Sequence, residues 1–93
     1  MYARPTIYNK TLTDANTEYS QAVSADAKKV LIRERSGSYD VKLAYATGTS
    51  GTLYITLPAG SSKYLEGIWV RGLTLFMQSA QAGVVVEVEE WKR

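Results

Sequence analysis

The segment Val84–Trp91 reads VVVEVEEW and decides the fold of this chain. Val84, Val86 and Val88 occupy every second position, and the charged residues Glu87 and Glu89 have the opposite phase. A period of two is that of a β-strand, which directs successive side chains to opposite faces of a sheet. We therefore expect the three valines to face a core and the two glutamates to face outward.

The same alternation recurs along the chain in short runs that end at Gly, Ser, Thr, Asn or Asp. Three further sets of alternating residues are predicted to share a core face: Val41, Leu43 and Tyr45; Leu53, Ile55 and Leu57; and Leu73, Leu75 and Met77. The predicted strands are residues 6–12, 17–23, 28–35, 40–46, 52–58, 63–66, 73–79 and 84–91. Residues 67–72 form the least regular segment, and no segment keeps a helical apolar period.

This pattern predicts an all-β fold, a single small antiparallel β-sandwich of about eight strands that covers residues 1–93. Jelly-roll and Ig-like arrangements both fit, and the number of strands slightly favours a jelly roll. A chain of this length buries roughly 65% of its unfolded surface, which makes a thin core. It has no Cys to form a disulfide, so binding to copies of itself or to a larger assembly would add stability.

The charge and hydropathy of the chain argue against two classes of partner. It has 11 basic and 9 acidic residues, a net charge of +2, whereas nucleic-acid binding calls for a clustered basic face. The apolar runs fall far short of the ~20 residues that a membrane helix needs. The N-terminus lacks the apolar segment of a signal peptide. We expect no nucleic acid, no membrane and folding in a cytoplasm.

Catalytic chemistry has little support in the residue types present. The chain has no His and no Cys, which removes the usual general base, the common nucleophile pairs and the preferred zinc ligands. Glu87 and Glu89 lie roughly 7 Å apart on one strand face, near the spacing of glycosidase carboxylates, but a solvated face explains them better. Asp14, Asp26 and Asp40 fit turns better than a calcium site. We expect no enzyme, no catalytic residue, no metal and no cofactor.

Two surface features remain open to more than one interpretation. Arg33, Arg35 and Lys42 form either a basic patch for an acidic partner or ordinary surface charge that Glu34, Glu87 and Glu89 balance. The seven Tyr and two Trp residues suit protein interfaces or sugar-binding platforms, because their rings carry a polar group. Alternatively, they fill the edges of the thin core.

Five segments together resemble small structural proteins of tailed bacteriophages and prophages. They are NTEYSQ (16–21), KKVLI (28–32), DVKLAY (40–45), YITLPAG (54–60) and GVVVEVEEW (83–91). The resemblance extends from Thr11 to Trp91 and rests on strand and turn segments. It implies a β-sandwich component of the virion, made in the cytoplasm of the host bacterium, and it assigns no functional residues.

The function expected from this resemblance is that of a capsid-decorating or capsid-stabilising protein on the exterior of the head. Its partner would be the major capsid protein or another virion protein. We also expect a homo-oligomer, and a trimer would match a threefold site on a capsid. The alternatives are a tail, neck or fibre component, or a carbohydrate- or receptor-binding module. A coplanar row of exposed Tyr or Trp on one sheet face would distinguish the sugar-binding module.

The contacts with the partner are expected at one end or edge of the sandwich, because the inner sheet faces form the core. The N-terminal arm, residues 1–8, could add a strand to the edge of a neighbouring sheet, and the irregular segment 67–72 displays a tryptophan. The predicted contact residues are Tyr2, Arg4, Pro5, Tyr8 and Trp69.

Overall fold

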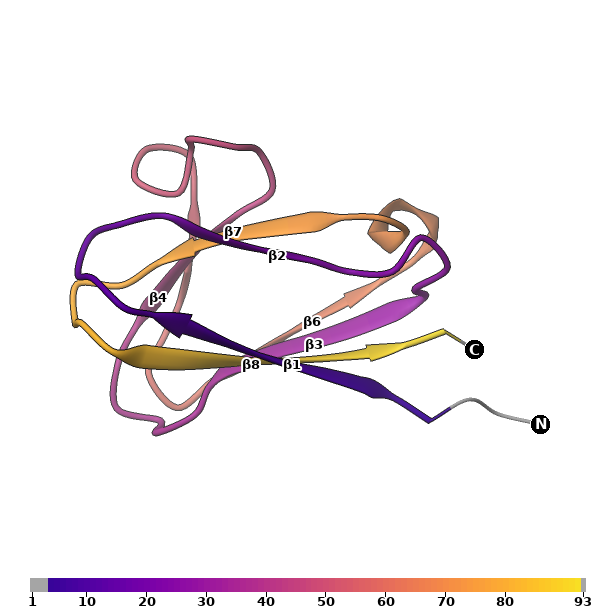
Figure 1. Cartoon of the computed structure of the whole chain (residues 1–93), viewed down its shortest axis with the longest axis horizontal. Helices are drawn as coiled ribbons and strands as arrows, with labels where there is room; N and C mark the ends of the chain where they lie inside the picture. The colour runs from indigo at the N-terminus through magenta and orange to yellow at the C-terminus, as the bar shows by residue number, and fades with distance from the viewer. Residues whose placement is uncertain (1–3, 93) are drawn as a thin grey trace.

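Two four-stranded antiparallel sheets pack face to face in a computed structural model that describes residues 4–92 (Figure 1). The first, called here the β8 sheet, has the order β1 (Thr6–Leu12), β8 (Val84–Trp91), β3 (Lys29–Glu34) and β6 (Ser62–Glu66). The second, the β7 sheet, has the order β2 (Tyr19–Ala22), β7 (Thr74–Gln78), β4 (Val41–Ala44) and β5 (Ile55–Leu57). The fold is an antiparallel β-sandwich, as the alternation predicts.

The strand order is that of a jelly roll. Each strand pairs with its counterpart from the other half of the chain: β1 with β8, β2 with β7, β3 with β6 and β4 with β5. Lateral pairing of β3 with β8 and of β4 with β7 completes the two sheets. The chain is therefore one long hairpin rolled into two layers, which decides between the two arrangements that strand spacing leaves open.

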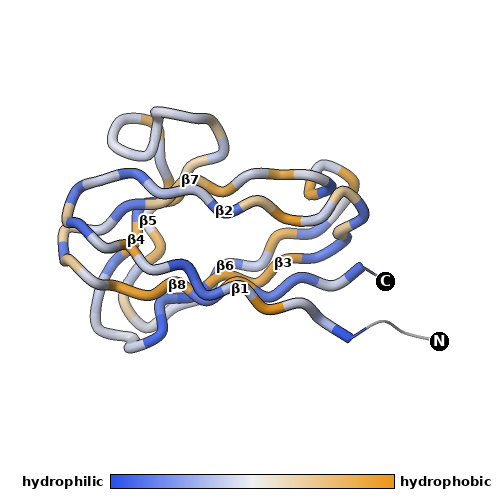
Figure 2. Tube along the Cα trace, viewed as in Figure 1, coloured by the Kyte–Doolittle hydropathy of each residue, from blue (hydrophilic) through white to orange (hydrophobic). Residues whose placement is uncertain are grey.

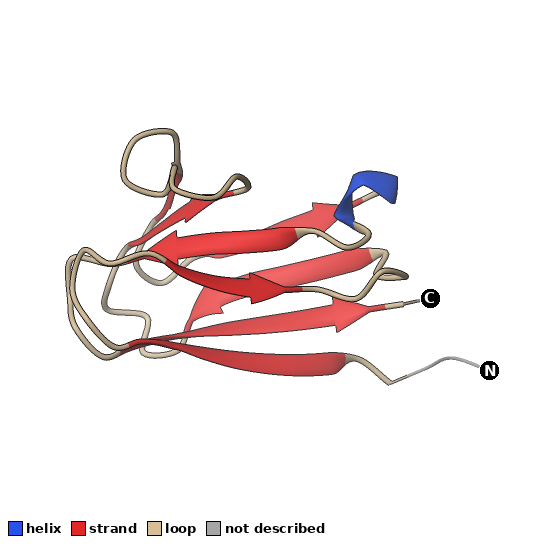
Figure 3. Ribbon diagram, turned by 45° about the horizontal axis from the view of Figure 1, so that its top comes forward, coloured by secondary structure: helices blue, strands red, loops and turns tan. Residues whose placement is uncertain are grey.

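The predicted strands are confirmed, with some differences in their ends. β1 and β8 have the predicted bounds, β6 begins one residue earlier, and the other strands are shorter than predicted. The irregular segment 67–72 contains a short 3-10 helix, η1 (Ile68–Val70), drawn in blue in Figure 3. No helix within residues 4–92 is long and apolar enough to cross a membrane.

The core lies between the two sheets and follows the predicted phase on most strands. More and less buried residues alternate along β1 and β8, and Figure 2 shows the hydropathy of the residues along these strands. Val84, Val86 and Val88 are buried, and Glu87 and Glu89 face the outer side. The other buried apolar side chains of the strands include Val30, Ile32, Val41, Leu43, Leu57, Leu75 and Met77.

The prediction is wrong for two residues around the start of β5. Alternation predicts that Leu53 and Ile55 face the core with Leu57, but they are 77% and 45% exposed. β5 has only three residues and lies at the edge of the β7 sheet. It therefore has a neighbour on one side only, and the core covers Leu57 but not the residues before it.

The long loop between β4 and β5 folds over the outer face of the β7 sheet, as its position in Figures 1 and 3 shows. Its Ser50 is fully buried and accepts a hydrogen bond from Gln78 Nε2 on β7 at 2.9 Å. Glu18 accepts hydrogen bonds from the backbone N–H groups of Gly48 at 2.7 Å and Ser50 at 3.0 Å. Within residues 4–92, no comparable loop covers the outer face of the β8 sheet.

Candidate functional site

The segment around η1 projects two large apolar side chains into solvent at one end of the sandwich. Ile68 is 75% exposed and Trp69 is 51% exposed, whereas Val70 is fully buried and anchors the segment in the core. Trp69 Nε1 donates a hydrogen bond to the carbonyl oxygen of Glu66 at 3.0 Å. Its ring also meets the Tyr45 ring edge-on, with centroids 5.8 Å apart. Trp69 is thus held in one orientation while half of its surface stays free.

The backbone around η1 needs a glycine at position 67. Gly67 has a φ of +121°, which L side chains rarely adopt, and a Cβ at this position would lie 3.1 Å from Cδ1 of Trp69. Two hydrogen bonds tie the ends of the segment to the β2–β3 loop, from Gly67 N to Lys28 O at 3.2 Å and from Gly72 N to Ser24 O at 2.9 Å. The segment is therefore a braced loop.

Three cations surround this segment. Lys28, Lys29 and Arg71 line a hollow of about 340 Å³ together with Glu66, Gly67 and Ile68. The ion pairs found within residues 4–92 are those of Arg33 and Arg35 with Glu87, so none of these three cations is paired there. We call the set Lys28, Lys29, Ile68, Trp69 and Arg71 the η1 platform. It combines apolar contact area with an excess of positive charge.

The predicted contact residues differ in their placement. Tyr2 lies outside the described residues, and Arg4 and Pro5 are exposed just before β1. Tyr8 is half-buried and packs against the core, which matches the alternative interpretation of the aromatics as core-edge residues. The start of β1, the C-terminal end of β8 and η1 lie at the same end of the sandwich (Figure 1). The structure thus brings Arg4, Pro5 and Trp69 to one end.

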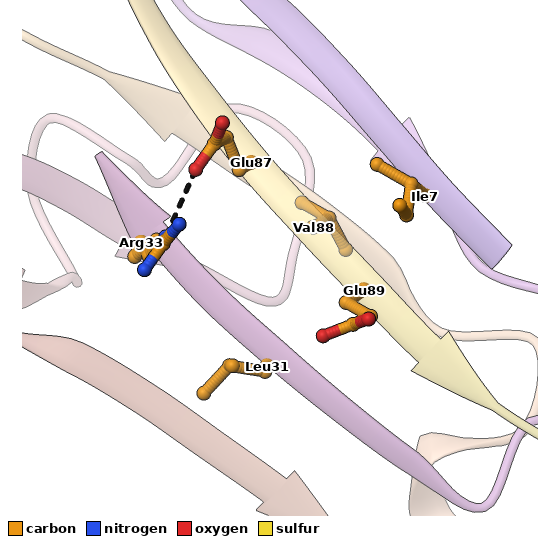
Figure 4. A pocket seen from close by; sticks show the side chains of 6 residues that line it. All are labelled: Ile7, Leu31, Arg33, Glu87, Val88 and Glu89. Atoms are coloured by element: carbon orange, nitrogen blue, oxygen red, sulfur yellow. Dashed lines mark hydrogen bonds and ion pairs between the residues drawn. The ribbon is translucent and has the colours of Figure 1, made fainter. Parts of the chain in front are cut away.

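The outer face of the β8 sheet carries a second, smaller feature. A hollow of about 250 Å³ is lined by Ile7, Leu31, Arg33, Glu87, Val88 and Glu89 (Figure 4). Its volume lies below the ~300–1,000 Å³ of typical small-molecule sites. Glu87 Oε1 and Oε2 accept hydrogen bonds from Arg33 Nε at 2.9 Å and Arg35 Nε at 3.0 Å.

These hydrogen bonds, first from Arg33 and then from Arg35, lower the pKa of Glu87. A carboxylate held in its ionised form by two guanidinium groups is a poor proton donor, so the geometry favours the structural interpretation of the Glu87 and Glu89 pair. The predicted basic patch is only partly correct. Arg33 and Arg35 are neighbours around Glu87, but Lys42 is on the β7 sheet, where its Nζ lies 4.9 Å from the centroid of the Tyr54 ring.

The turn aspartates do not converge. Asp40 Oδ1 accepts a hydrogen bond from the backbone N–H of Ala59 at 2.7 Å, and Asp14 contacts the Tyr19 hydroxyl at 3.4 Å. Asp26 is in the β2–β3 loop, at the opposite end of the sandwich from these two. Among the described residues, no group of three acidic, His or Cys side chains is arranged to hold a metal ion.

Sequence reasoning missed three carboxylates that organise loops. Glu18 fixes the β4–β5 loop, and hydrogen bonds from the side chain and backbone of Ser50, then from the backbone of Gly48, lower its pKa. Glu34 is buried and binds the β3–β4 loop. Glu90 is fully buried, and its Oε1 accepts a hydrogen bond from Ser24 N at 3.0 Å.

Comparison with known proteins adds no assignment: no protein-family model matches the chain, and no curated protein matches it. The function therefore has to be inferred from the chemistry and geometry of the surface.

Proposed function

We propose that this chain is a structural protein of a tailed-phage virion, specifically a capsid-decorating protein bound to the exterior of the head. The observation that carries the proposal is the η1 platform, in which Ile68 and Trp69 are exposed and braced beside three cations. A preorganised surface loses less conformational freedom on binding than a mobile loop does. Trp and Arg are also enriched among the residues that dominate binding energy.

The η1 platform suits an acidic protein surface that carries apolar side chains. Ile68 and Trp69 would become buried in the contact, and Lys28, Lys29 and Arg71 would pair with carboxylates of the partner. Complementary charges accelerate association and fix orientation, and salt weakens them when they are exposed. A head-bound protein that bridges neighbouring copies of the major capsid protein in this way would resist internal pressure.

The residue chemistry supports a structural role over a catalytic one. The whole chain lacks His and Cys, the residue types of the commonest general base and nucleophile pairs. Jelly rolls occur in both capsid proteins and lectins. The fold therefore does not distinguish a protein-binding role from a sugar-binding one, and the surface residues must be compared. Tyr64 and Trp91 are inclined at 52° and Tyr45 and Trp69 at 82°. Neither pair offers the coplanar rings that a sugar platform would present, which favours a protein partner.

Co-sedimentation of the purified protein with assembled phage heads tests this proposal. We expect saturable binding at a fixed ratio to the major capsid protein, and we expect Trp69→Ala to weaken it by about tenfold or more, as for a residue at the centre of an interface. Tyr39→Ala is the matched control, because Tyr39 is an exposed aromatic residue in the loop at the opposite end. Equal binding of both variants would reject the η1 platform as the contact.

The same assay separates the remaining locations and examines the arm. Binding to purified tails but not to heads would favour a tail, neck or fibre component. Deletion of residues 1–5 should leave the protein folded, because Arg4 and Pro5 are exposed and precede β1. If the deletion leaves head binding unchanged, the arm is not an anchor. Absence of binding to heads and to tails would overturn the virion proposal.

A further inference from the structure

A row of outward-facing residues crosses the four strands of the β8 sheet, apolar or aromatic on β1, β3 and β6 and charged at Glu89 on β8. The strand registers place Ile7 beside Glu89, Glu89 beside Leu31, and Leu31 beside Tyr64. Ile7 is 64% exposed and Tyr64 is 55% exposed. The Tyr64 ring also contacts Trp91, with centroids 6.2 Å apart. This row lies on the sheet face that no described loop covers, so its apolar side chains are available to a partner.

The ion pairs on this face leave some charges without a partner. Arg33 and Arg35 both bind Glu87, which leaves one positive charge in excess in that group. Glu89 is one position further along the outer face of β8, and within residues 4–92 it has no ion-pair partner. Figure 4 shows Ile7 and Leu31 on either side of β8, with Arg33 and Glu89 at separate points around the hollow. The face therefore carries both an excess guanidinium and an unpaired carboxylate.

We propose that this face binds the same face of a second copy of the chain about a two-fold axis. In a two-fold contact, any residue pair formed once is formed twice. Glu89 of each copy would pair with Arg33 of the other, and Ile7, Leu31 and Tyr64 would bury their apolar surface on either side of these ion pairs. The occupant is a second copy because the face supplies both members of the ion pair as well as the apolar side chains of the row.

The size of the face indicates a reversible dimer. Four strands about 4.8 Å apart, each with five to seven paired residues that rise ~3.4 Å, give an area on the order of 400 Å². A standard interface buries ~800 Å² per partner. We therefore expect dimerisation that depends on protein concentration and weakens in high salt, since salt screens the exposed charge of Arg33.

Sedimentation velocity across a protein concentration series tests the proposal with two charge-reversed variants. Arg33→Glu alone and Glu89→Arg alone should each remain monomeric, because each places like charges opposite one another twice. An equimolar mixture of the two variants should form a heterodimer, because both cross-pairs then have opposite charges. Association restored only in the mixture supports the two-fold contact. A mixture that stays monomeric while the wild type dimerises overturns it.

Apolar variants provide a second, independent measurement. Ile7→Asp should weaken wild-type dimerisation by about tenfold, because it places a charge within the apolar contact. Leu53→Asp should leave it unchanged, because Leu53 is similarly exposed but lies beside the other sheet. Circular dichroism establishes that each variant is folded. A wild-type protein that is monomeric at every concentration, or a trimer insensitive to Ile7 and Glu89, would also overturn the proposal.

Discussion

Glu34 shows how a single charged side chain can organise a loop from inside the protein. Its carboxylate accepts hydrogen bonds from the backbone N–H groups of Ser36 at 2.7 Å, Ser38 at 3.1 Å and Tyr39 at 3.2 Å. Burial alone would raise the pKa of Glu34, but hydrogen bonds from the Ser36 side chain and from these backbone groups outweigh it and lower the pKa. The ionised carboxylate therefore stabilises the β3–β4 loop.

The Glu34→Ala variant should lose about 1–3 kcal/mol of unfolding free energy at pH 7, since the loop donors lose their acceptor. The pKa of Glu34 is lower in the folded protein than in the unfolded chain. The contribution of Glu34 to the unfolding free energy is therefore complete above the unfolded-state pKa of ~4.3. It disappears as the pH falls through the folded-state pKa. Denaturant titrations of both proteins between about pH 7 and pH 2 measure this difference. A difference that stays constant with pH would contradict the role assigned to the ionised form.

The phase of alternation predicts that two glutamates face the core. Glu34 shares the phase of Val30 and Ile32, and Glu90 shares that of Val86 and Val88, so period two predicts that both glutamates face inward. Charge alone suggests the opposite and predicts that Glu34 is one of the surface charges that balance the arginines. The hydrogen-bond donors that make its burial tolerable come from a loop, whose conformation the pattern does not specify.

At the scale of elements, β8 was predictable to the residue and β5 was not. β8 lies between β1 and β3, so pairing on both sides and burial of one face impose its register over its whole length. β5 pairs with β4 alone, over three residues. The apolar positions before it follow the same alternation but have no sheet opposite them. Alternation therefore fails at β5 because this strand is short and lies at the sheet edge, whereas the longer edge strand β1 keeps its alternating burial.

Two adjacent residues of β8 should respond very differently to substitution. Val86→Asp buries an unpaired carboxylate in the core, and we expect it to cost more than about 4 kcal/mol or to prevent folding. Glu87→Gln affects ion pairs whose arginines are more than half exposed, so it should cost less than about 1 kcal/mol. Thermal unfolding of the two variants compares them directly. Similar losses in both would show that the register of β8 differs from the one described.

The irregular segment 67–72 illustrates what an element prediction leaves out. Its lack of alternation correctly indicates a break between strands, with Trp69 displayed there. The bracing of Trp69 depends on Tyr45, which follows β4, and on the carbonyl of Glu66 at the end of β6. The spacing of residues along the sequence does not predict these contacts. The η1 platform and its three cations are therefore recognised only in the folded structure.

At the scale of the whole molecule, the sequence pattern specifies a two-layer sandwich but not its connections. Alternation determines which side chains face inward, and every antiparallel sandwich satisfies that requirement equally. The choice of neighbours depends on which strands meet across the chain, and Thr6 pairs with Glu90 close to the opposite terminus. Residues from both ends and from the middle must therefore come together before either the outer row of the β8 sheet or the η1 platform exists.

This pairing of the first strand with the last has a kinetic consequence. Leu43 and Ile55, which pair in the β4–β5 hairpin, are close in sequence, whereas β1 and β8 close the longest loop in the chain. On a ribosome, the β8 sheet cannot be completed until the final strand has emerged. Such non-local topologies refold in about milliseconds to seconds, and stopped-flow refolding would measure this. Microsecond refolding would contradict it, and slow closure would leave the edge of β3 open to other nascent chains.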